Sequence, residues 1–143
     1  MPQLPTSNRI TAAPNPEPGG FLDELDLRWM GGKRPYALSE PYRYDSLLLD
    51  RVVTVPYGYR TDFASIPRAF WLILPPHGHY VPAAVIHDYL CDLRGSTGID
   101  SKTTHAVFRE AMEVLRVPAW KRVVMYHAVR WFGPRFKAQK TEN

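Results

Sequence analysis

The sequence predicts an α+β fold in which a small antiparallel sheet packs against about three C-terminal helices. The first observation behind this prediction is that strand-like segments, partly alternating or rich in β-branched residues, occupy the first half of the 143-residue chain. The second is that apolar residues recur at helical spacing through the second half. Together they place the sheet first and a helical layer on it, as in α+β proteins.

Residues 1–20 are expected to form an extended arm. Prolines at positions 2, 5, 14, 16 and 18 fix φ and remove backbone donors, and the segment ends in two glycines. Such an arm either lies on a partner in a larger assembly or is an unstructured leader. A single α+β domain is expected over residues 21–134 and a basic tail over residues 135–143, because the chain is too short for two independent domains.

Two strand regions and one irregular loop are expected before the helices. Residues 21–29 alternate in part and are followed by a glycine pair, which indicates a turn. Residues 47–55 are enriched in β-branched side chains and end at a Pro-Tyr-Gly turn. Residues 60–80 lack periodicity and carry several prolines, and loops of this kind often build sites on a rigid scaffold.

Three helices are expected after the loop. The first covers about residues 82–93, with proline in its first turn and a stop at Arg94-Gly95. The second begins near Ser101 or Lys102, and its apolar face carries His105, Phe108, Met112 and Leu115. The third covers about residues 118–132, and its stripe, which we expect to pack in the core, carries Trp120, Val124, His127 and Trp131.

The charge, the cysteine count and the lengths of the apolar runs indicate which partners, covalent links and targeting signals to expect. The formal charge is +4, but acids and bases are interspersed and only residues 130–140 are locally basic, so nucleic acid is not expected as a partner. The single cysteine, Cys91, excludes an internal disulfide and multi-cysteine metal motifs. The sequence has neither an apolar run of about 18 residues nor the pattern of a signal peptide, so no membrane span and no export signal are expected.

Polar residues that fall among apolar ones mark the candidate site. Asp62, Ser65, His87 and Asp88 lie in two short segments of mainly apolar character. Burial of such groups without partners costs several kcal/mol. We therefore expect either a hydrogen-bonded network or a metal-centred site.

The metal hypothesis assigns Asp62, His87 and His105 as ligands. Neutral imidazole and carboxylate suit zinc, iron(II) or manganese, and a catalytic ion needs about three protein ligands and one open position. Asp88 is then the candidate general base, or else an orienting group or fourth ligand. Cys91 lies one helical turn after His87 and is either a further ligand or a small buried hydrophobe.

Simpler readings stay open beside this hypothesis. Each of the histidines, His127 included, is equally compatible with a hydrogen-bonded core position. The His87-Asp88 dipeptide by itself is weak support for a phosphohydrolase. Ser65 fits a turn formed with Asp62 better than it fits a nucleophile, because no glycine-rich elbow surrounds it.

Three segments carry a resemblance to a known family: residues 61–68 (TDFASIPR), 83–90 (AAVIHDYL) and 126–133 (YHAVRWFG). Over about residues 52–133 the chain resembles a phage and prophage protein family of unknown function, numbered 1353. The resemblance implies a phage or prophage origin, and it identifies Ser65, Pro67 and Arg68 as part of the family's turn. His105 stands where family members usually have aspartate, and both residue types bind metals.

Two functions follow as expectations. In the first, the protein is a virion-associated structural or accessory protein of the tail or baseplate type, located in the virion or the host cytoplasm. It would bind other phage proteins through residues 1–20 and the basic tail. In the second, it is a metal-dependent hydrolase, with peptidoglycan as a candidate substrate.

Overall fold

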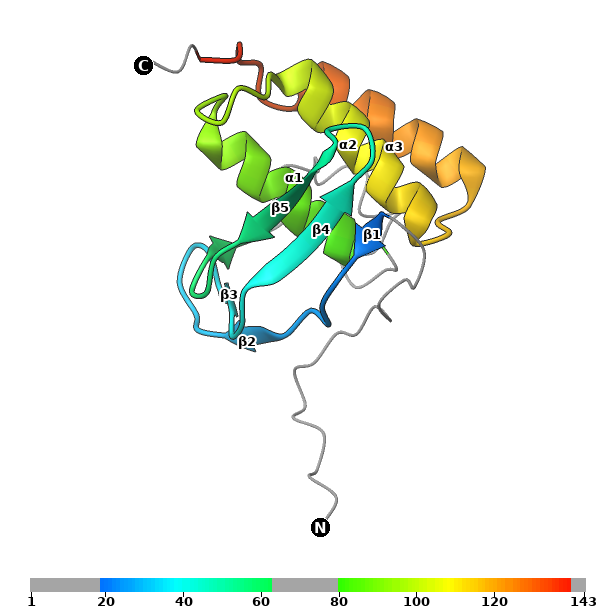
Figure 1. Cartoon of the computed structure of the whole chain (residues 1–143). Helices are drawn as coiled ribbons and strands as arrows, with labels where there is room; N and C mark the ends of the chain where they lie inside the picture. Colours follow the sequence, from blue (N-terminus) through cyan, green and yellow to red (C-terminus); the bar gives the residue numbers. More distant parts are fainter. Residues whose placement is uncertain (1–18, 63–79, 140–143) are drawn as a thin grey trace.

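The computed structural model describes residues 19–62 and 80–139, and over these residues it confirms the α+β fold. The described residues contain two three-stranded antiparallel sheets followed by three helices (Figure 1). Most of the expected arm lies outside the described residues. So do three residues of the family's turn, Ser65, Pro67 and Arg68.

The first sheet has the order β1-β4-β5. Its strands are β1 (Gly20–Phe21), β4 (Tyr42–Ser46) and β5 (Arg51–Val55). Gly20, expected to end the arm, instead pairs with Asp45. The long strand expected over residues 47–55 is also shorter than predicted, because residues 47–50 form the turn of the β4–β5 hairpin.

The second sheet has the order β2-β3-β6. Its strands are β2 (Leu27–Trp29), β3 (Tyr36–Leu38) and β6 (Arg60–Thr61). The segment expected as one strand over residues 21–29 thus contributes a short strand to each sheet. Its strands are only two and three residues long, too short for alternation to show clearly in the sequence.

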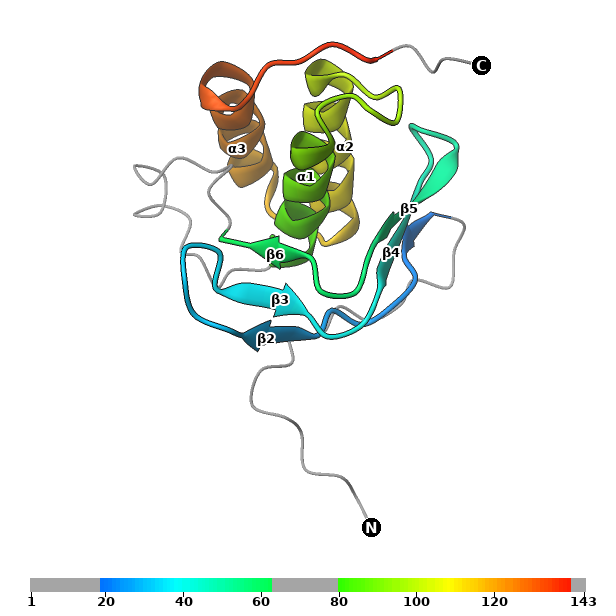
Figure 2. The same ribbon diagram turned by 90° about the vertical axis from the view of Figure 1, so that its left-hand side faces the viewer.

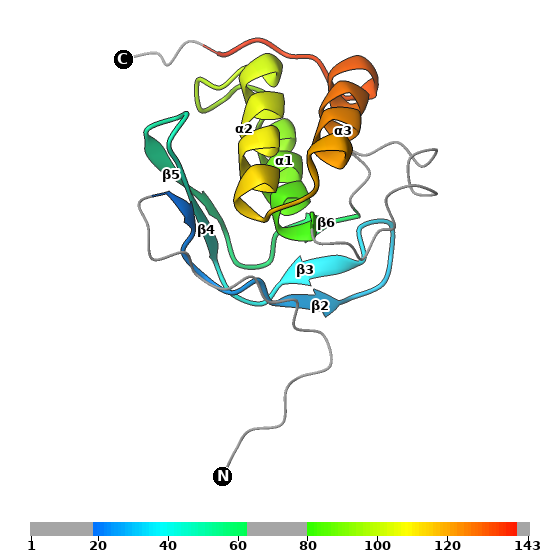
Figure 3. The ribbon, with the colours of Figure 1, turned by 90° about the vertical axis from the view of Figure 1, so that its right-hand side faces the viewer.

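The three helices are α1 (Val81–Leu93), α2 (Ser101–Val114) and α3 (Ala119–Phe132). The bounds of α1 and α3 and the start of α2 are close to those predicted. α1 carries proline in its first turn and ends at Arg94 in a left-handed conformation. The Asp100 side chain caps α2 by accepting a 2.7 Å hydrogen bond from the Thr103 amide. Figures 2 and 3 show that the two sheets lie at an angle to each other and that the three helices pack together on one side of them.

The core lies between the sheets and the helices. The inward face of α2 is as predicted, with His105, Phe108 and Met112 buried. The expectation for α3 is wrong: Trp120 and Trp131 are 56% and 65% exposed, and His127 is exposed as well. α3 has a second apolar stripe, and it is this one that is buried, through Met125, Ala128 and Val129.

The start of the expected basic tail folds back on its own chain. The Ser101 amide donates to the Phe136 carbonyl at 3.0 Å, and the Gln139 amide donates to the Gly95 carbonyl at 2.9 Å. Gly95 has a φ of +82°, and a Cβ there would lie 2.1 Å from the Lys137 carbonyl oxygen. Glycine is therefore required where the C-terminal segment crosses the α1–α2 connection.

Candidate functional site

Two buried histidines meet between α1 and α2. The Nε2 atom of His87 lies 2.9 Å from the Nδ1 atom of His105, and the two residues are 0% and 2% exposed. The Phe108 ring covers His87, with ring centroids 4.7 Å apart. The packing of α1 on α2 therefore brings together two of the three expected metal ligands.

Both imidazoles are held in the neutral form. Burial lowers the pKa of His87 to about 3, and the neighbouring His105 contributes to this shift. Burial also lowers the pKa of His105; the charge of Arg130 acts in the same direction, while a hydrogen bond to the Pro134 backbone opposes it. One ring nitrogen of a neutral pair donates the shared proton and the other accepts it.

Cys91 lies beside this pair on α1. Its sulfur is 3.7 Å from Nε2 and 3.9 Å from Nδ1 of His87. Burial is the main cause that raises the pKa of the Cys91 thiol, and the charges of Asp88 and Asp92 add to it. The thiol therefore stays protonated near neutral pH and is not a nucleophile by itself.

Asp88 lies at a different contact, where α1 meets the sheet. Its Oδ2 atom accepts a 2.5 Å hydrogen bond from the Thr61 hydroxyl of β6. Both residues are buried, and Asp62 follows directly in the chain in a half-buried position. Asp88 is thus tied to the strand that leads into Asp62.

The complete ligand set stays a prediction. Within residues 19–62 and 80–139, no group of three or more His, Cys, Asp or Glu side chains is arranged to hold a metal ion. The two histidines are a pair there, and Asp62 does not join them in such a group. Asp88 of α1 is hydrogen-bonded to the Thr61 hydroxyl, and His87 of α1 to the His105 imidazole. These are the partners that a hydrogen-bonded network requires.

Glu110 of α2 is a half-buried acid that the sequence analysis did not identify. Its carboxylate accepts hydrogen bonds from the Tyr44 hydroxyl at 2.6 Å, the Ser46 hydroxyl at 2.8 Å and the Leu48 amide at 2.8 Å. It therefore fixes α2 to the β4–β5 hairpin. The inward positions of Tyr44 and Ser46 in β4 were the available signal, since a buried hydroxyl needs a partner.

A second acid, Asp92, joins α1 to the other sheet. Arg34 donates to both of its carboxylate oxygens, at 2.6 Å and 3.0 Å, and the Tyr59 hydroxyl donates at 2.7 Å. Although burial opposes it, hydrogen bonding to Arg34 and Tyr59 holds the pKa of Asp92 below its usual value. This bidentate pair is structural, since both oxygens are occupied.

A basic cleft opens where α2 begins and α3 ends. Its volume is about 520 Å³, and its lining residues are Ser101, Lys102, His105, His127, Arg130, Trp131 and Arg135. His105 therefore has two surroundings: one ring nitrogen meets His87 in the interior, while the residue also contributes to the wall of the cleft. The buried pair therefore adjoins a surface recess at this cleft.

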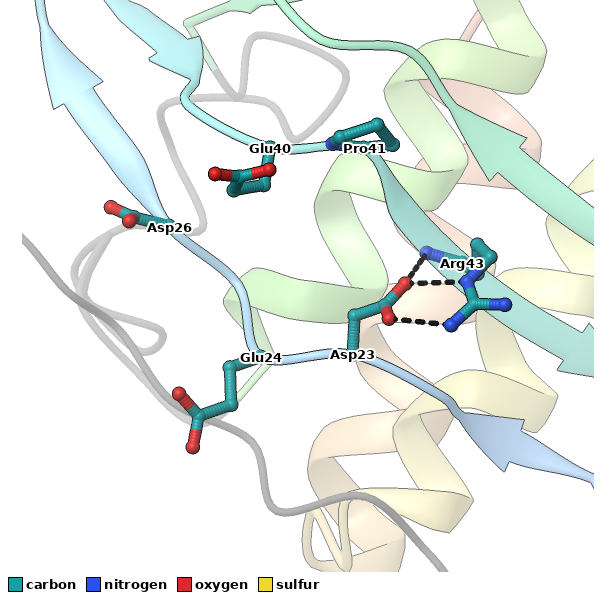
Figure 4. Close-up of a pocket in the computed structure, with 6 residues that line it drawn as sticks. All are labelled: Asp23, Glu24, Asp26, Glu40, Pro41 and Arg43. Carbon is teal, nitrogen blue, oxygen red and sulfur yellow. Dashed lines mark hydrogen bonds and ion pairs between the residues drawn. The ribbon is translucent and has the colours of Figure 1, made fainter.

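An acidic cleft of about 460 Å³ lies on the sheet side, lined by Asp23, Glu24, Asp26, Glu40, Pro41 and Arg43. Figure 4 shows the Asp23 and Arg43 side chains facing each other, with Glu24 extending away from them. Arg43 donates to the two Asp23 oxygens at 2.9 Å and 2.8 Å, and this interaction lowers the pKa of Asp23. The pair connects the start of the domain to β4, a structural role.

None of the helices in the described part of the chain has the length and apolar character needed to cross a membrane. No solved structure matches the chain.

Two curated proteins of Sinorhizobium fredii are similar to it. Uncharacterized protein y4jT is 46% identical over 82 residues, which is 56% of this chain and 24% of y4jT. Uncharacterized protein y4iH is 38% identical over 79 residues, which is 54% of this chain and 32% of y4iH. The chain thus matches about a quarter to a third of the length of these relatives.

The family comparison covers strands β3 to β6, helices α1 and α2, and most of α3. The model of the family described as "Protein of unknown function (DUF1353)" matches residues 36–129. This range contains His87, His105 and most of α3. The chain belongs to the DUF1353 family.

Proposed function

We propose that the protein is a virion-associated structural or accessory component of the tail or baseplate type, which binds another phage protein through the solvent face of α3. The observation that carries this proposal is the exposure of Trp120 and Val123, at 56% and 54%, three positions apart on α3. Large apolar side chains grouped on one surface are typical of protein interaction sites. Tryptophan in particular is enriched among residues that dominate binding energy.

The phage part of the proposal rests on the resemblance of the sequence to phage and prophage proteins. The relatives y4jT and y4iH do not bear on the phage part, but the matched region is only 24% and 32% of their lengths, so a domain of this kind occurs beside further polypeptide. A domain that occurs beside further polypeptide is well suited to work as one module of an assembly. The expected arm, residues 1–20, supplies a second point of attachment.

Incorporation into particles tests the proposal. Particles released from a host that carries the gene should contain the chain, detected by mass spectrometry after purification. Val123→Asp should strongly reduce incorporation, because it places a charge in the centre of the proposed interface. Val52→Asp is the matched control, since Val52 is 45% exposed on β5, and it should incorporate normally. Absence of the chain from purified particles contradicts the proposal.

Deletion of the arm provides a second test. Removal of residues 1–18, which keeps Gly20 and its pairing with Asp45 in the first sheet, should abolish incorporation and leave the melting temperature of the domain nearly unchanged. Normal incorporation of the deletion variant would remove the arm from the proposal while leaving the α3 surface in place.

A metal-dependent hydrolase is the second candidate, with peptidoglycan as the proposed substrate. The observation that favours it is the 2.9 Å contact between His87 and His105 with the Cys91 sulfur 3.7 Å from His87. Imidazole and thiolate are preferred zinc ligands, and Asp62, which does not group with them in the described structure, would have to move to become the third or fourth ligand. Asp88 is then the proposed general base on a metal-bound water.

Elemental analysis of the untagged protein tests this candidate. Near-stoichiometric zinc, iron or manganese that is lost in His87→Ala supports this candidate. The melting temperature should fall in the same variant, because an ion that binds only the native state stabilises it. His127→Ala is the matched control, since His127 is exposed on α3. Metal content that is equal in wild type and His87→Ala would contradict the hydrolase.

A further inference from the structure

Three cations from separate segments meet at the basic cleft. Lys102 belongs to the first turn of α2, Arg130 to the last turn of α3, and Arg135 to the segment after α3. No carboxylate lines the cleft, and within the described ranges no Asp or Glu forms a salt bridge with any of the three. The nearby Asp100 carboxylate caps α2 through the Thr103 amide and also attracts Lys102, but it forms no salt bridge with it and does not line the cleft. Three neighbouring positive charges repel one another unless an anion joins them.

The same cleft carries flat, accessible rings. Trp131 is 65% exposed, and its ring lies 5.5 Å from that of His127, measured between centroids. Both residues line the cleft beside Arg130. A tryptophan face next to a cation is the combination on which single-stranded nucleic acids stack their bases.

The deeper wall is polar but uncharged. His105 is 2% exposed and belongs to the lining, while its Nδ1 atom is occupied by His87. The volume of about 520 Å³ is within the range of small-molecule sites. The cleft thus combines a basic rim, an aromatic rim and a neutral wall.

We infer that the cleft binds a nucleotide, with its phosphate among Lys102, Arg130 and Arg135 and its base against Trp131. The ligand that this cleft fits has a phosphate group beside a base that is not paired with another base. Two sources supply it, a free mononucleotide or one unit of a single-stranded nucleic acid. This surface was not expected from the sequence, in which these cations are separated by up to 33 positions.

Binding to the full-length chain, measured by isothermal titration calorimetry, tests the inference. The ligands are adenosine 5′-monophosphate, adenosine, inorganic phosphate and a single-stranded oligodeoxythymidine, with a duplex of equal length as comparison. The monophosphate should bind more tightly than adenosine or inorganic phosphate, because each of these lacks one of the two contacts. Binding of the single strand without the monophosphate also supports the site and identifies nucleic acid as the source.

Charge variants separate the cleft from the general basic character of the chain. Arg130→Gln should weaken binding about tenfold, the expected effect of losing one charge-assisted contact to phosphate. Arg28→Gln is the control, since it removes the same charge from an exposed position on β2 and should leave the affinity unchanged. Circular dichroism of both variants verifies that the fold is retained.

A pair of tryptophan variants tests the base contact. Trp131→Leu should weaken binding of the monophosphate about tenfold by removing a stacking surface, and leave binding of inorganic phosphate unchanged. Trp120→Leu, on the same face of α3 but outside the cleft, should bind as wild type does. The inference is overturned if neither nucleotide source binds, if the duplex binds as tightly as the single strand, or if Arg28→Gln weakens binding as much as Arg130→Gln.

Discussion

The helices α1 and α3 have nearly equal lengths but opposite surroundings. α1 has 13 residues, of which ten are buried, whereas α3 has 14 residues, of which three are buried. α1 contacts both α2 and β5, while α3 packs mainly against α2. α1 is the more apolar of the two helices and has more elements packed on it, and both properties go with its greater burial.

Because of this difference, the two helices carry different kinds of residue chemistry. In α1, covered on several sides, polar groups such as His87 and Asp88 must be satisfied internally, and each has a partner. In α3, apolar groups such as Trp120 and Trp131 face solvent and are available to other molecules. Changes in α1 should therefore affect stability, and changes on the solvent face of α3 should affect binding.

The largest expected effect is in the core around α1. Ile86 is fully buried, and Ile86→Ala should lower the free energy of unfolding by about 2–5 kcal/mol, because it removes buried methyl groups and leaves a cavity. Urea denaturation monitored by circular dichroism measures the change. A loss below about 1 kcal/mol would show that α1 is less tightly packed than its burial indicates.

Glu110 extends the comparison to the contact between α2 and the first sheet. Glu110→Ala should cost about 2–4 kcal/mol, because it leaves the buried hydroxyls of Tyr44 and Ser46 without their acceptor. Glu110→Gln retains an acceptor oxygen and should cost less. Equal losses in the two variants would mean that the negative charge, and not the hydrogen bonds, supplies the stabilisation.

The buried histidines should make stability depend on pH. The pKa of His87 is about 3 in the folded chain against an ordinary value of 6.5, so between these values the unfolded chain binds a proton that the folded chain does not. The free energy of unfolding should therefore fall as the pH drops below 6.5, approaching about 1.4 kcal/mol per pH unit for this group, with His105 adding in the same direction.

Urea denaturation at several pH values between 7.5 and 4.5 measures this dependence. Carboxylates such as Asp23 and Asp92 add to the loss mainly below this range, because the unfolded chain takes up their protons around the ordinary pKa of 3.8 and the folded chain only at a lower pH. His127→Ala should keep the dependence, and His87→Leu should reduce it. Equal unfolding free energies at pH 7.5 and pH 5 would contradict the buried neutral pair.

The smallest effect on stability is expected on the solvent face of α3. Trp120→Ala should change the free energy of unfolding by less than about 0.5 kcal/mol, because the side chain is 56% exposed. The same denaturation experiment applies. A loss comparable to that of Ile86→Ala would show that this face is covered in solution, and the contrast between the two helices would fail.

The sequence was a good guide to the helices, and a poor guide to the short strands and to what each helix packs against. The bounds of α1 and α3 and the start of α2 were predicted closely, because helix start and stop residues such as the proline in α1 and Gly133 after α3 are local signals. The strands β3 and β4 were not predicted individually, since three to five residues carry little periodicity. For α3 the choice between two apolar stripes was made wrongly, because periodicity does not say which stripe meets a neighbour.

The sequence by itself determined the α+β class, the three helices and the residue types of the candidate site, because helix signals and hydrophobic periodicity depend on neighbours in the chain. Only the tertiary structure decided that His87 meets His105, that Glu110 binds the β4–β5 hairpin, and that Lys102, Arg130 and Arg135 share one cleft. The physical reason is the separation along the chain: His87 and His105 are 18 positions apart, and Tyr44 of the hairpin and Glu110 are 66 positions apart. Contacts over such separations depend on how the elements pack. Local sequence carries no signal for that packing.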